Sequence, residues 1–346
     1  MQALAHGTCR GTTGLLAELL YSRRVREGSR LASEHMALLE SIGDPTLTMG
    51  SAVVAFLNWV HVGEFGEILR WSQTVVDLAE GDPAKGAGFG FGSPLAVALA
   101  WRGVARWWLG RPGWRQDLHD AVAMARRSDP TTLASVVAWT YGLAMLYGVL
   151  RADDSAVRAS EEAVQIAASS NWATLGLAEH TLGVALLSRD AVADRHRGLE
   201  LMVQARDVWR ERVPLLVPVA ELWVARERAG RGDRDAAIPV MRQAVDELHH
   251  EGQLFYGVWG TGVLVETLLD RGVDDDAAEA EAAIERLAAA PADGSVIRDV
   301  CLLRLRALLA RARGEDLVYQ DFRDRYRDMA RMRGFEGHIA WAEAMP

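Results

Sequence analysis

Small residues recur at a nearly constant spacing along this chain, and this recurrence constrains the fold more than any other feature. The consecutive spacings are 41, 39, 42, 37 and 45 residues, and each small residue lies inside an apolar segment. The residues are Gly103, Ala144, Gly183, Ala225, Gly262 and Ala307. A polar hinge follows each segment, as in Gly230-Arg231-Gly232-Asp233. Self-similarity at this period indicates a stacked array of short supersecondary units.

A second helical stretch after the hinges carries its own series of alanines. Their spacings are 38, 42, 39 and 39 residues, and they are Ala125, Ala163, Ala205, Ala244 and Ala283. We interpret the small residues as points where the two helices of a unit approach closely, while neighbouring units bury their apolar stripes. The alternation typical of strands is absent from the sequence. The sequence therefore predicts an all-α, right-handed superhelical solenoid of about eight helix–turn–helix repeats.

The predicted repeats form a single array over residues 1–346. Their bounds are about 1–44, 45–83, 93–130, 131–171, 172–212, 213–252, 253–291 and 294–338, and residues 84–92 form a glycine-rich inter-repeat loop. The loop contains a GxGxGxG pattern, but no strand precedes it as a dinucleotide-binding turn requires. We interpret it as a flexible loop whose Phe89 and Phe91 pack on a neighbour. The alternative is a phosphate or nucleotide contact at the next helix N-terminus, near Ser93.

The charged residues argue against several classes of partner. The net charge is −9, with 38 basic and 47 acidic residues, whereas broad nucleic-acid binding needs a basic surface. Lys85 is the only lysine, and no Ser or Thr follows it, so a phosphate-binding loop of the usual kind is excluded. Cys9 and Cys301 are far apart and suit a reducing compartment. We therefore predict a cytoplasmic protein that binds no nucleic acid.

Two uncharged runs, at residues 45–63 and 130–150, approach the length of a membrane-spanning helix. Both contain several polar residues, and both occupy a recurring phase of the repeat, where a helix packed between neighbours is apolar on nearly all sides. Glu18 interrupts the nearest candidate for a signal peptide. The prediction is that the chain neither enters nor spans a membrane.

Parts of the repeat resemble the tetratricopeptide repeat. Leu182-Gly183 reproduces the Leu-Gly pair of that repeat. Ala125 followed by Ser128-Asp129-Pro130 resembles its C-terminal end, where alanines precede a terminal proline. The units here are longer than the 34 residues of that repeat, and several lack the proline. In this respect they are nearer to the longer, degenerate repeats of bacterial signalling ATPases.

A more specific resemblance is to the C-terminal region of mycobacterial multidomain adenylate cyclase-like proteins. It is carried by Gly92 to Ala100, by Gly110 to Arg115 and by the tail from Phe322 to Pro346, which includes Gly334-Phe335-Glu336-Gly337-His338 and the terminal Trp341-Ala342-Glu343-Ala344-Met345-Pro346. In that family a cyclase domain and an ATPase module precede a helical-repeat region. The resemblance covers essentially the whole chain, but only that last region. It implies a regulatory module whose partner is a separate or fused cyclase or ATPase domain.

The candidate binding residues come from the geometry of tetratricopeptide-like units, whose first helices line a concave groove. If the recurrent small residue faces the partner helix, positions three before it and one or four after it point to the groove. With Tyr256, one turn before Trp259, this interpretation gives Trp107, Tyr141, His180, Arg226, Tyr256 and Trp259, together with Val104 and Met145. Aromatic and arginine side chains on a concave wall suit capture of a peptide or small molecule. The competing interpretation is that these aromatic residues belong to the core.

No catalytic or metal site is predicted. Asp274-Asp275-Asp276 is interpreted as acidic residues at a helix N-terminus, and no nucleophile and base can be paired. The leading hypothesis is a non-catalytic regulatory, sensor or protein-interaction module without a cofactor, which binds a protein, a peptide or a small-molecule effector in its groove. One alternative is a small-molecule-binding α-toroid enzyme, which needs converging carboxylates, and of these we identify only Glu266. The other is the ligand-sensing part of a transcriptional regulator whose DNA-binding domain is absent.

Overall fold

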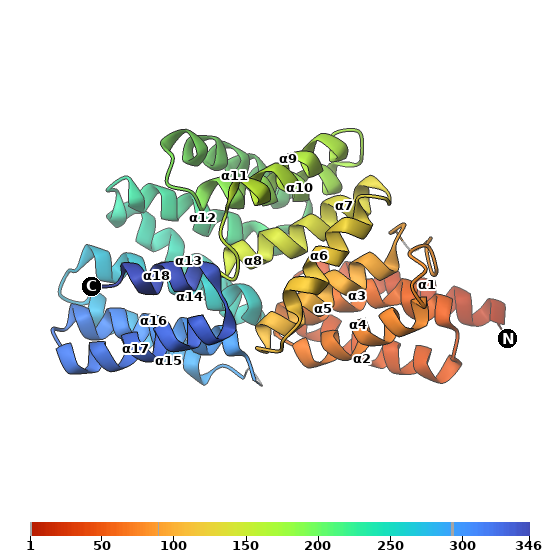
Figure 1. Ribbon diagram of the computed structural model, residues 1–346, viewed down its shortest axis with the longest axis horizontal. Helices are drawn as coiled ribbons and strands as arrows, with labels where there is room; N and C mark the ends of the chain where they lie inside the picture. Colours follow the sequence, from red (N-terminus) through yellow and green to blue (C-terminus); the bar gives the residue numbers. More distant parts are fainter. Residues whose placement is uncertain (1, 89, 292–293) are drawn as a thin grey trace.

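The computed structural model describes residues 2–88, 90–291 and 294–346, and helices form nearly all of this part of the chain (Figure 1). No strand occurs in these ranges, which confirms the predicted all-α solenoid. The helices of the first half are α1 (Gln2–Tyr21), α2 (Val25–Ile42), α3 (Pro45–Val62), α4 (Phe65–Ala79), α5 (Pro94–Trp108), α6 (Trp114–Ala125), α7 (Pro130–Val137), α8 (Leu143–Leu146) and α9 (Asp154–Ala167). Those of the second half are α10 (Trp172–Leu187), α11 (Val192–Arg212), α12 (Val217–Gly230), α13 (Arg234–Glu251), α14 (Leu254–Arg271), α15 (Asp276–Ala289), α16 (Val296–Ala312), α17 (Asp316–Arg333) and α18 (Glu336–Ala344).

Two short segments of other helical types interrupt this series. A π-helix, η1 (Ala138–Gly142), joins α7 to α8, and a 3₁₀ helix, η2 (Pro214–Leu216), precedes α12. With α7, η1 and α8 taken as one interrupted helix, the elements from α1 to α17 follow one another as pairs. We propose that each pair is one repeat unit, with α18 packed against the array after the last pair.

Local capping explains why many of the helices begin where they do. The Asp44 side chain accepts hydrogen bonds from the amides of Thr46 and Leu47 at the start of α3. Asp129 and Asn171 cap α7 and α10 in the same way. A side-chain oxygen at this position satisfies amides that have no partner within the helix. Short polar side chains just before α3, α7 and α10 therefore fix where these helices start.

Small residues allow close helix crossings in some units but not in all. A Cβ added at Gly183 would lie 3.3 Å from Met202 Cε and 3.4 Å from the carbonyl oxygen of Gly198, both on α11. Gly103 similarly faces Leu118 of α6. For Gly262 the expectation was wrong, because a Cβ there would meet nothing within 4 Å. Gly260 makes the close contact on α14 instead, against Leu222 and residues of α13.

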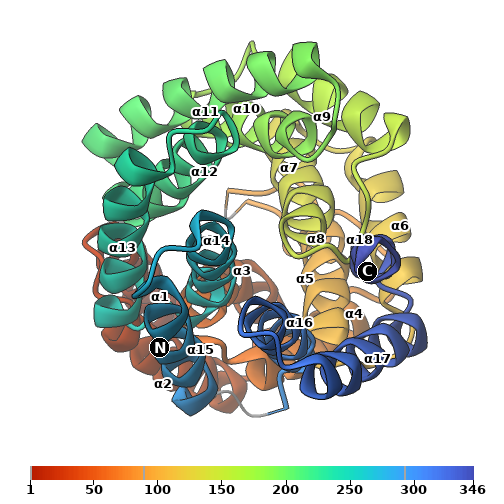
Figure 2. The same ribbon diagram turned by 90° about the vertical axis from the view of Figure 1, so that its left-hand side faces the viewer.

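The superhelix closes on itself after one turn (Figure 2). Helix α14 contacts α3, and α16 contacts α5, so the C-terminal units lie against the N-terminal ones. At one contact, Gly148 and Gly337 approach so closely that a Cβ on Gly337 would lie 2.8 Å from the Gly148 Cα. The amides of Glu336 and His338 then donate to the carbonyl oxygens of Val149 and Gly148, at 3.0 and 3.1 Å. The first helix of each unit thus faces a central lumen.

The two uncharged runs pack against neighbouring helices of the array. Most residues of α3 are buried, among them Asn58 and His61, which are polar. Asn58 Nδ2 donates to the carbonyl oxygen of Val54 at 2.9 Å, a bond within α3 itself. Within the described ranges, no helix combines the length and the apolar character needed to cross a bilayer.

Candidate functional site

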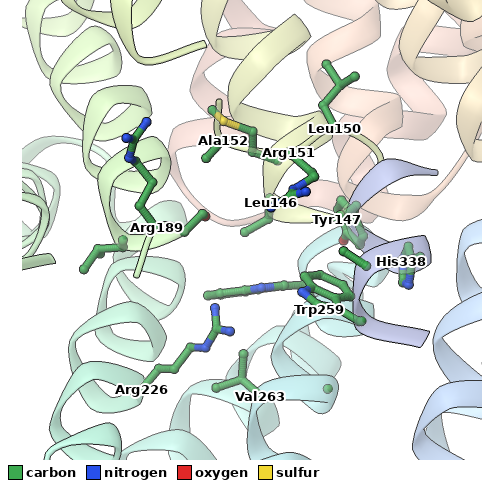
Figure 3. Close-up of a pocket in the computed structure, with 18 of the residues that line it drawn as sticks. Leu146, Tyr147, Leu150, Arg151, Ala152, Arg189, Arg226, Trp259, Val263 and His338 are labelled. Carbon is green, nitrogen blue, oxygen red and sulfur yellow. The ribbon is translucent and has the colours of Figure 1, made fainter. Parts of the chain in front are cut away.

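A cavity of about 840 Å³ occupies one end of the lumen, and we call it the arginine cavity. Its wall comes from α8, the connection between α10 and α11, α12, α14, α16 and α18. Figure 3 shows Arg226 of α12 and Trp259 of α14 reaching into the same space, with Arg151 and Arg189 at other parts of the wall. The volume lies in the range of sites that bind small molecules and peptide segments.

Arg226 is the distinctive group of the arginine cavity. Its guanidinium lies 5.3 Å from the centre of the Trp223 ring, which itself packs at 5.0 Å from Trp259. The guanidinium forms no hydrogen bond or ion pair with any residue in the described ranges. Burial lowers the pKa of Arg226, an effect that Glu266 partly offsets. Arg226 is half-buried, and a partly desolvated cation without a bonded counter-charge favours a bound anion.

Two of the acidic residues that line the arginine cavity, Glu227 and Glu266, act electrostatically on Arg226, and each is already paired with another arginine. Glu266 forms an ion pair with Arg304, and Glu227, which is buried, bonds to Arg195 at 2.8 Å. Burial acts to raise the pKa of Glu266, but Arg304 and Arg226 together hold it below its usual value. The described lining as a whole carries five arginines and five acidic residues, and Glu227 and Glu266 are engaged by arginines other than Arg226.

The rim of the arginine cavity is polar and carries both signs of charge. Arg189 bonds to Asp154 at 2.7 Å and to Asp194 at 2.8 Å. Arg151 and Asp190 also lie on the rim and are exposed. A polar rim around an apolar and cationic interior is the usual anatomy of a recognition site.

A second cavity, of about 390 Å³, lies in the lumen between the N-terminal helices and the middle units. Its wall comes from the end of α1, α3, α5, the α7–η1–α8 segment, α10, the end of α11, η2, α12 and α14. Tryptophan, leucine and valine side chains dominate it, and no Asp, Glu, Lys or Arg is among the described residues that line it. We call it the neutral cavity.

The structure places the predicted groove residues in the arginine cavity, in the neutral cavity or in the core. Arg226 and Trp259 meet in the arginine cavity, whereas His180 and Tyr256 line the neutral cavity. Trp107 lines neither, because it is fully buried and packs on Tyr147 at 5.7 Å between ring centres. Closure of the ring against α16 covers the inner face of α5, and this removes the groove expected there.

Tyr141 also lines neither cavity and is half-buried against the core. It lies in the π-helix, where each turn contains more residues than in an α-helix, so counting three positions back from Ala144 misplaces its side chain. Of the two further groove positions, Met145 lines the arginine cavity, whereas Val104 is fully buried.

Several residues of the arginine cavity were not predicted. Trp223 and Glu227 lie on α12 beside Arg226, and a wider window around that helix would have included them. Trp341 comes from α18, which lies after the last repeat, and the Arg304 guanidinium lies 5.1 Å from its ring centre. No repeat signal could have found it, because only the closed ring brings α18 to this wall.

Residues of the glycine-rich loop pack against and hydrogen-bond to other residues of the chain. Phe91 packs on Trp139 at 5.8 Å between ring centres, and Phe89 lies outside the described residues. The Ser93 hydroxyl accepts from the Ala96 amide at 3.2 Å, and the Asp129 carboxylate accepts from the Gly92 amide at 2.7 Å. A carboxylate at this helix N-terminus opposes the binding of a phosphate. No group of three or more potential metal ligands occurs among the described residues.

Comparison with known proteins is informative only at the level of the fold. No protein-family model matches the chain, and no curated protein matches it. It is similar in structure to a Rap protein complexed with competence and sporulation factor, with a TM-score of 0.58 and 13% identity over 97% of this chain and 89% of that one. A weaker likeness, with a TM-score of 0.44 and 11% identity, is to aspartyl phosphate phosphatase F from Bacillus subtilis, over 96% and 91% of the two chains. The first likeness establishes the helical-repeat fold alone.

Proposed function

We propose that this chain is a non-catalytic, cytoplasmic regulatory module that captures a peptide or small-molecule effector carrying a carboxylate in its arginine cavity. The observation that carries the proposal is the half-buried Arg226 guanidinium, which has no bonded counter-charge among the described residues. A carboxylate would complete a charge-assisted pair there, and Trp223 and Trp259 would contact the apolar part of the same molecule.

The shape of the molecule supports this proposal independently. A ring of stacked repeats places residues from distant units around one lumen, so a bound molecule can contact several units at once. The Rap protein of similar fold is known in complex with a factor, competence and sporulation factor. By analogy, this chain would use its lumen for recognition rather than for chemistry.

A selection experiment tests the proposal. The purified chain is used to select from a pool of random hexapeptides, and individual binders are measured by fluorescence polarisation. We expect Arg226→Met to weaken carboxylate-bearing binders by at least about 30-fold, since truncating one partner of a buried charge pair costs several kcal/mol. The matched control is Arg228→Met, because Arg228 lies on the same helix but is exposed and paired with Asp233 at 2.7 Å.

The outcomes of this selection are distinct. Binders that lose affinity with Arg226→Met and keep it with Arg228→Met support the proposal. A pool without binders, or binders equally affected by both substitutions, contradicts it. Circular dichroism of both variants verifies that the ring is still folded.

The partner that the module regulates is a further part of the proposal. The resemblance of Gly92–Ala100 and of the tail to mycobacterial adenylate cyclase-like proteins leads us to propose a cyclase or ATPase domain, separate or fused. Capture of an effector would change the curvature of the ring and thereby the state of that domain. Sequencing of the gene upstream of the Met1 codon tests the fused arrangement: an in-frame cyclase or ATPase sequence there supports it, and an in-frame stop codon directly upstream excludes it.

A further inference from the structure

The neutral cavity is chemically different from the arginine cavity, although both belong to the lumen. Eight of the described residues that line it are phenylalanine, tryptophan or tyrosine: Tyr21, Phe91, Trp101, Trp139, Trp172, Trp209, Phe255 and Tyr256. The polar side chains on the wall are uncharged types or histidines. A charged ligand would lose its hydration here without gaining a counter-charge, whereas an apolar one would gain from leaving water.

Several polar groups on this wall already have partners. His61 Nδ1 lies 3.2 Å from Gln253 Oε1, and the Thr131 and Thr174 hydroxyls lie 3.3 Å apart. Two nitrogens of the wall, His180 Nε2 and Trp101 Nε1, are buried and have no hydrogen-bond partner, and of these the imidazole nitrogen can also accept a hydrogen bond. The His180 ring packs at 4.7 Å from Trp209, and burial lowers the pKa of His180 to about 4, so the imidazole is neutral at physiological pH. A buried nitrogen of this kind favours a ligand that can offer it one hydrogen bond.

The backbone of the wall is also irregular at this point. The π-helix Ala138–Gly142 lies directly in it, with the Ala138, Trp139 and Gly142 positions facing the cavity. Interruptions of this type are maintained at a cost in regular hydrogen bonding and are frequent at functional sites. On α10, across the cavity, Gly176 is buried, yet a Cβ added to it would meet nothing within 4 Å. The space in front of Gly176 is therefore empty of protein.

We infer that the neutral cavity is a second binding site, for a small uncharged aromatic or aliphatic molecule with one hydrogen-bonding group directed at His180. The volume of about 390 Å³ suits a molecule with two or three fused or linked rings. This site is independent of the proposed function, because it shares neither Arg226 nor Trp259 with the arginine cavity.

The chain provides two matched substitutions that test the site. Gly176 lines the neutral cavity and Gly262 lines the arginine cavity, and both are helical glycines with free space in front of their Cα atoms. Leucine at either position should fill its own cavity without a clash, and both changes replace glycine by a better helix former. Each variant thus serves as the control for the other.

The probe is N-phenyl-1-naphthylamine, a neutral dye with one N–H group, followed by its fluorescence and by energy transfer from tryptophan. We expect saturable binding at one site per chain, retained in Gly262→Leu and weakened at least tenfold in Gly176→Leu. His180→Phe keeps the ring but removes the nitrogen, and it should weaken binding by about 2- to 10-fold.

Three results would overturn the inference: binding that does not saturate, equal binding by Gly176→Leu and the unaltered chain, or loss of binding in Gly262→Leu. Peptide selection with the same two variants separates the two proposals. If the arginine cavity binds the peptides, Gly262→Leu should lose them while Gly176→Leu retains them. Failure of either proposal therefore leaves the other testable.

Discussion

His61 of α3 and Gln253, the residue before α14, are joined by a buried hydrogen bond of 3.2 Å between Nδ1 and Oε1, although 192 positions separate them in the sequence. The Gln253 amide nitrogen also donates to the carbonyl oxygen of Leu215 at 3.3 Å. This contact fastens the second unit of the array to the seventh. A change in the curvature of the ring must therefore break or rearrange it.

The first prediction concerns this contact. Gln253→Leu should lower the free energy of unfolding by about 1–3 kcal/mol, because it leaves polar groups of His61 and Leu215 buried without a partner. Urea denaturation measures the change. Gln243→Leu is the control, since Gln243 is exposed and bonds only to Glu247 on its own helix, at 3.0 Å. Equal stability of the two variants would show that the contact does not hold the ring closed.

The second prediction concerns acid. Burial lowers the pKa of His61 to about 4, and burial together with Arg304 lowers that of His338 to about 3. Both lie below the ordinary value of 6.5, so the unfolded chain binds more protons than the folded one in the interval between. Stability from these groups is fully present above pH 6.5 and is lost as the pH falls towards 4, by about 1.4 kcal/mol per unit for each histidine.

Urea denaturation at pH 7.5, 6 and 5 measures this slope. His61→Gln should reduce the slope, because one of the contributing groups no longer titrates. His196→Gln should leave it unchanged, since His196 is exposed, with 67% of its side chain accessible. A flat profile between pH 6.5 and 5 would contradict the prediction.

The third prediction tests the helix crossing at Gly183. Gly183→Leu should lower the melting temperature, because its side chain would overlap Met202 and the backbone of Gly198 and force α10 away from α11. We expect a loss of about 1–3 kcal/mol. Gly176→Leu, on the same helix, meets open space and should not destabilise the chain. An unchanged melting temperature for Gly183→Leu would mean that the two helices do not cross there.

The fourth prediction concerns catalysis. The purified chain should show neither nucleotide cyclase activity nor ATP hydrolysis above buffer, because Glu227 and Glu266 are held in ion pairs with Arg195 and Arg304. Phosphate release and cyclic nucleotide formation are measured together. Either activity would contradict the non-catalytic interpretation if it scales with protein concentration and is lower in Arg226→Met than in the unaltered chain. A trace activity that is equal in the preparations of the unaltered chain and of Arg226→Met would indicate a contaminant.

The helices and their order could be predicted from the sequence because the interactions that define them are local. Asp44 caps a helix through amides two and three residues away, and the small residues that mark crossings recur with the period of the repeat. These signals depend on a few neighbouring residues, and a single sequence contains them in full. The all-α solenoid follows from them.

Closure of the ring was decided only by the tertiary structure. It depends on contacts such as Arg333 to the carbonyl oxygen of Gly110, at 2.7 Å and 223 positions apart, which leave no periodic trace in the sequence. Closure buries Trp107 and brings Trp341 to the wall of the arginine cavity, and the π-helix displaces Tyr141 from the lumen. The helical pattern identified Arg226 as a residue of the inner face, but its lack of a bonded counter-charge results from how distant units pair the neighbouring charges.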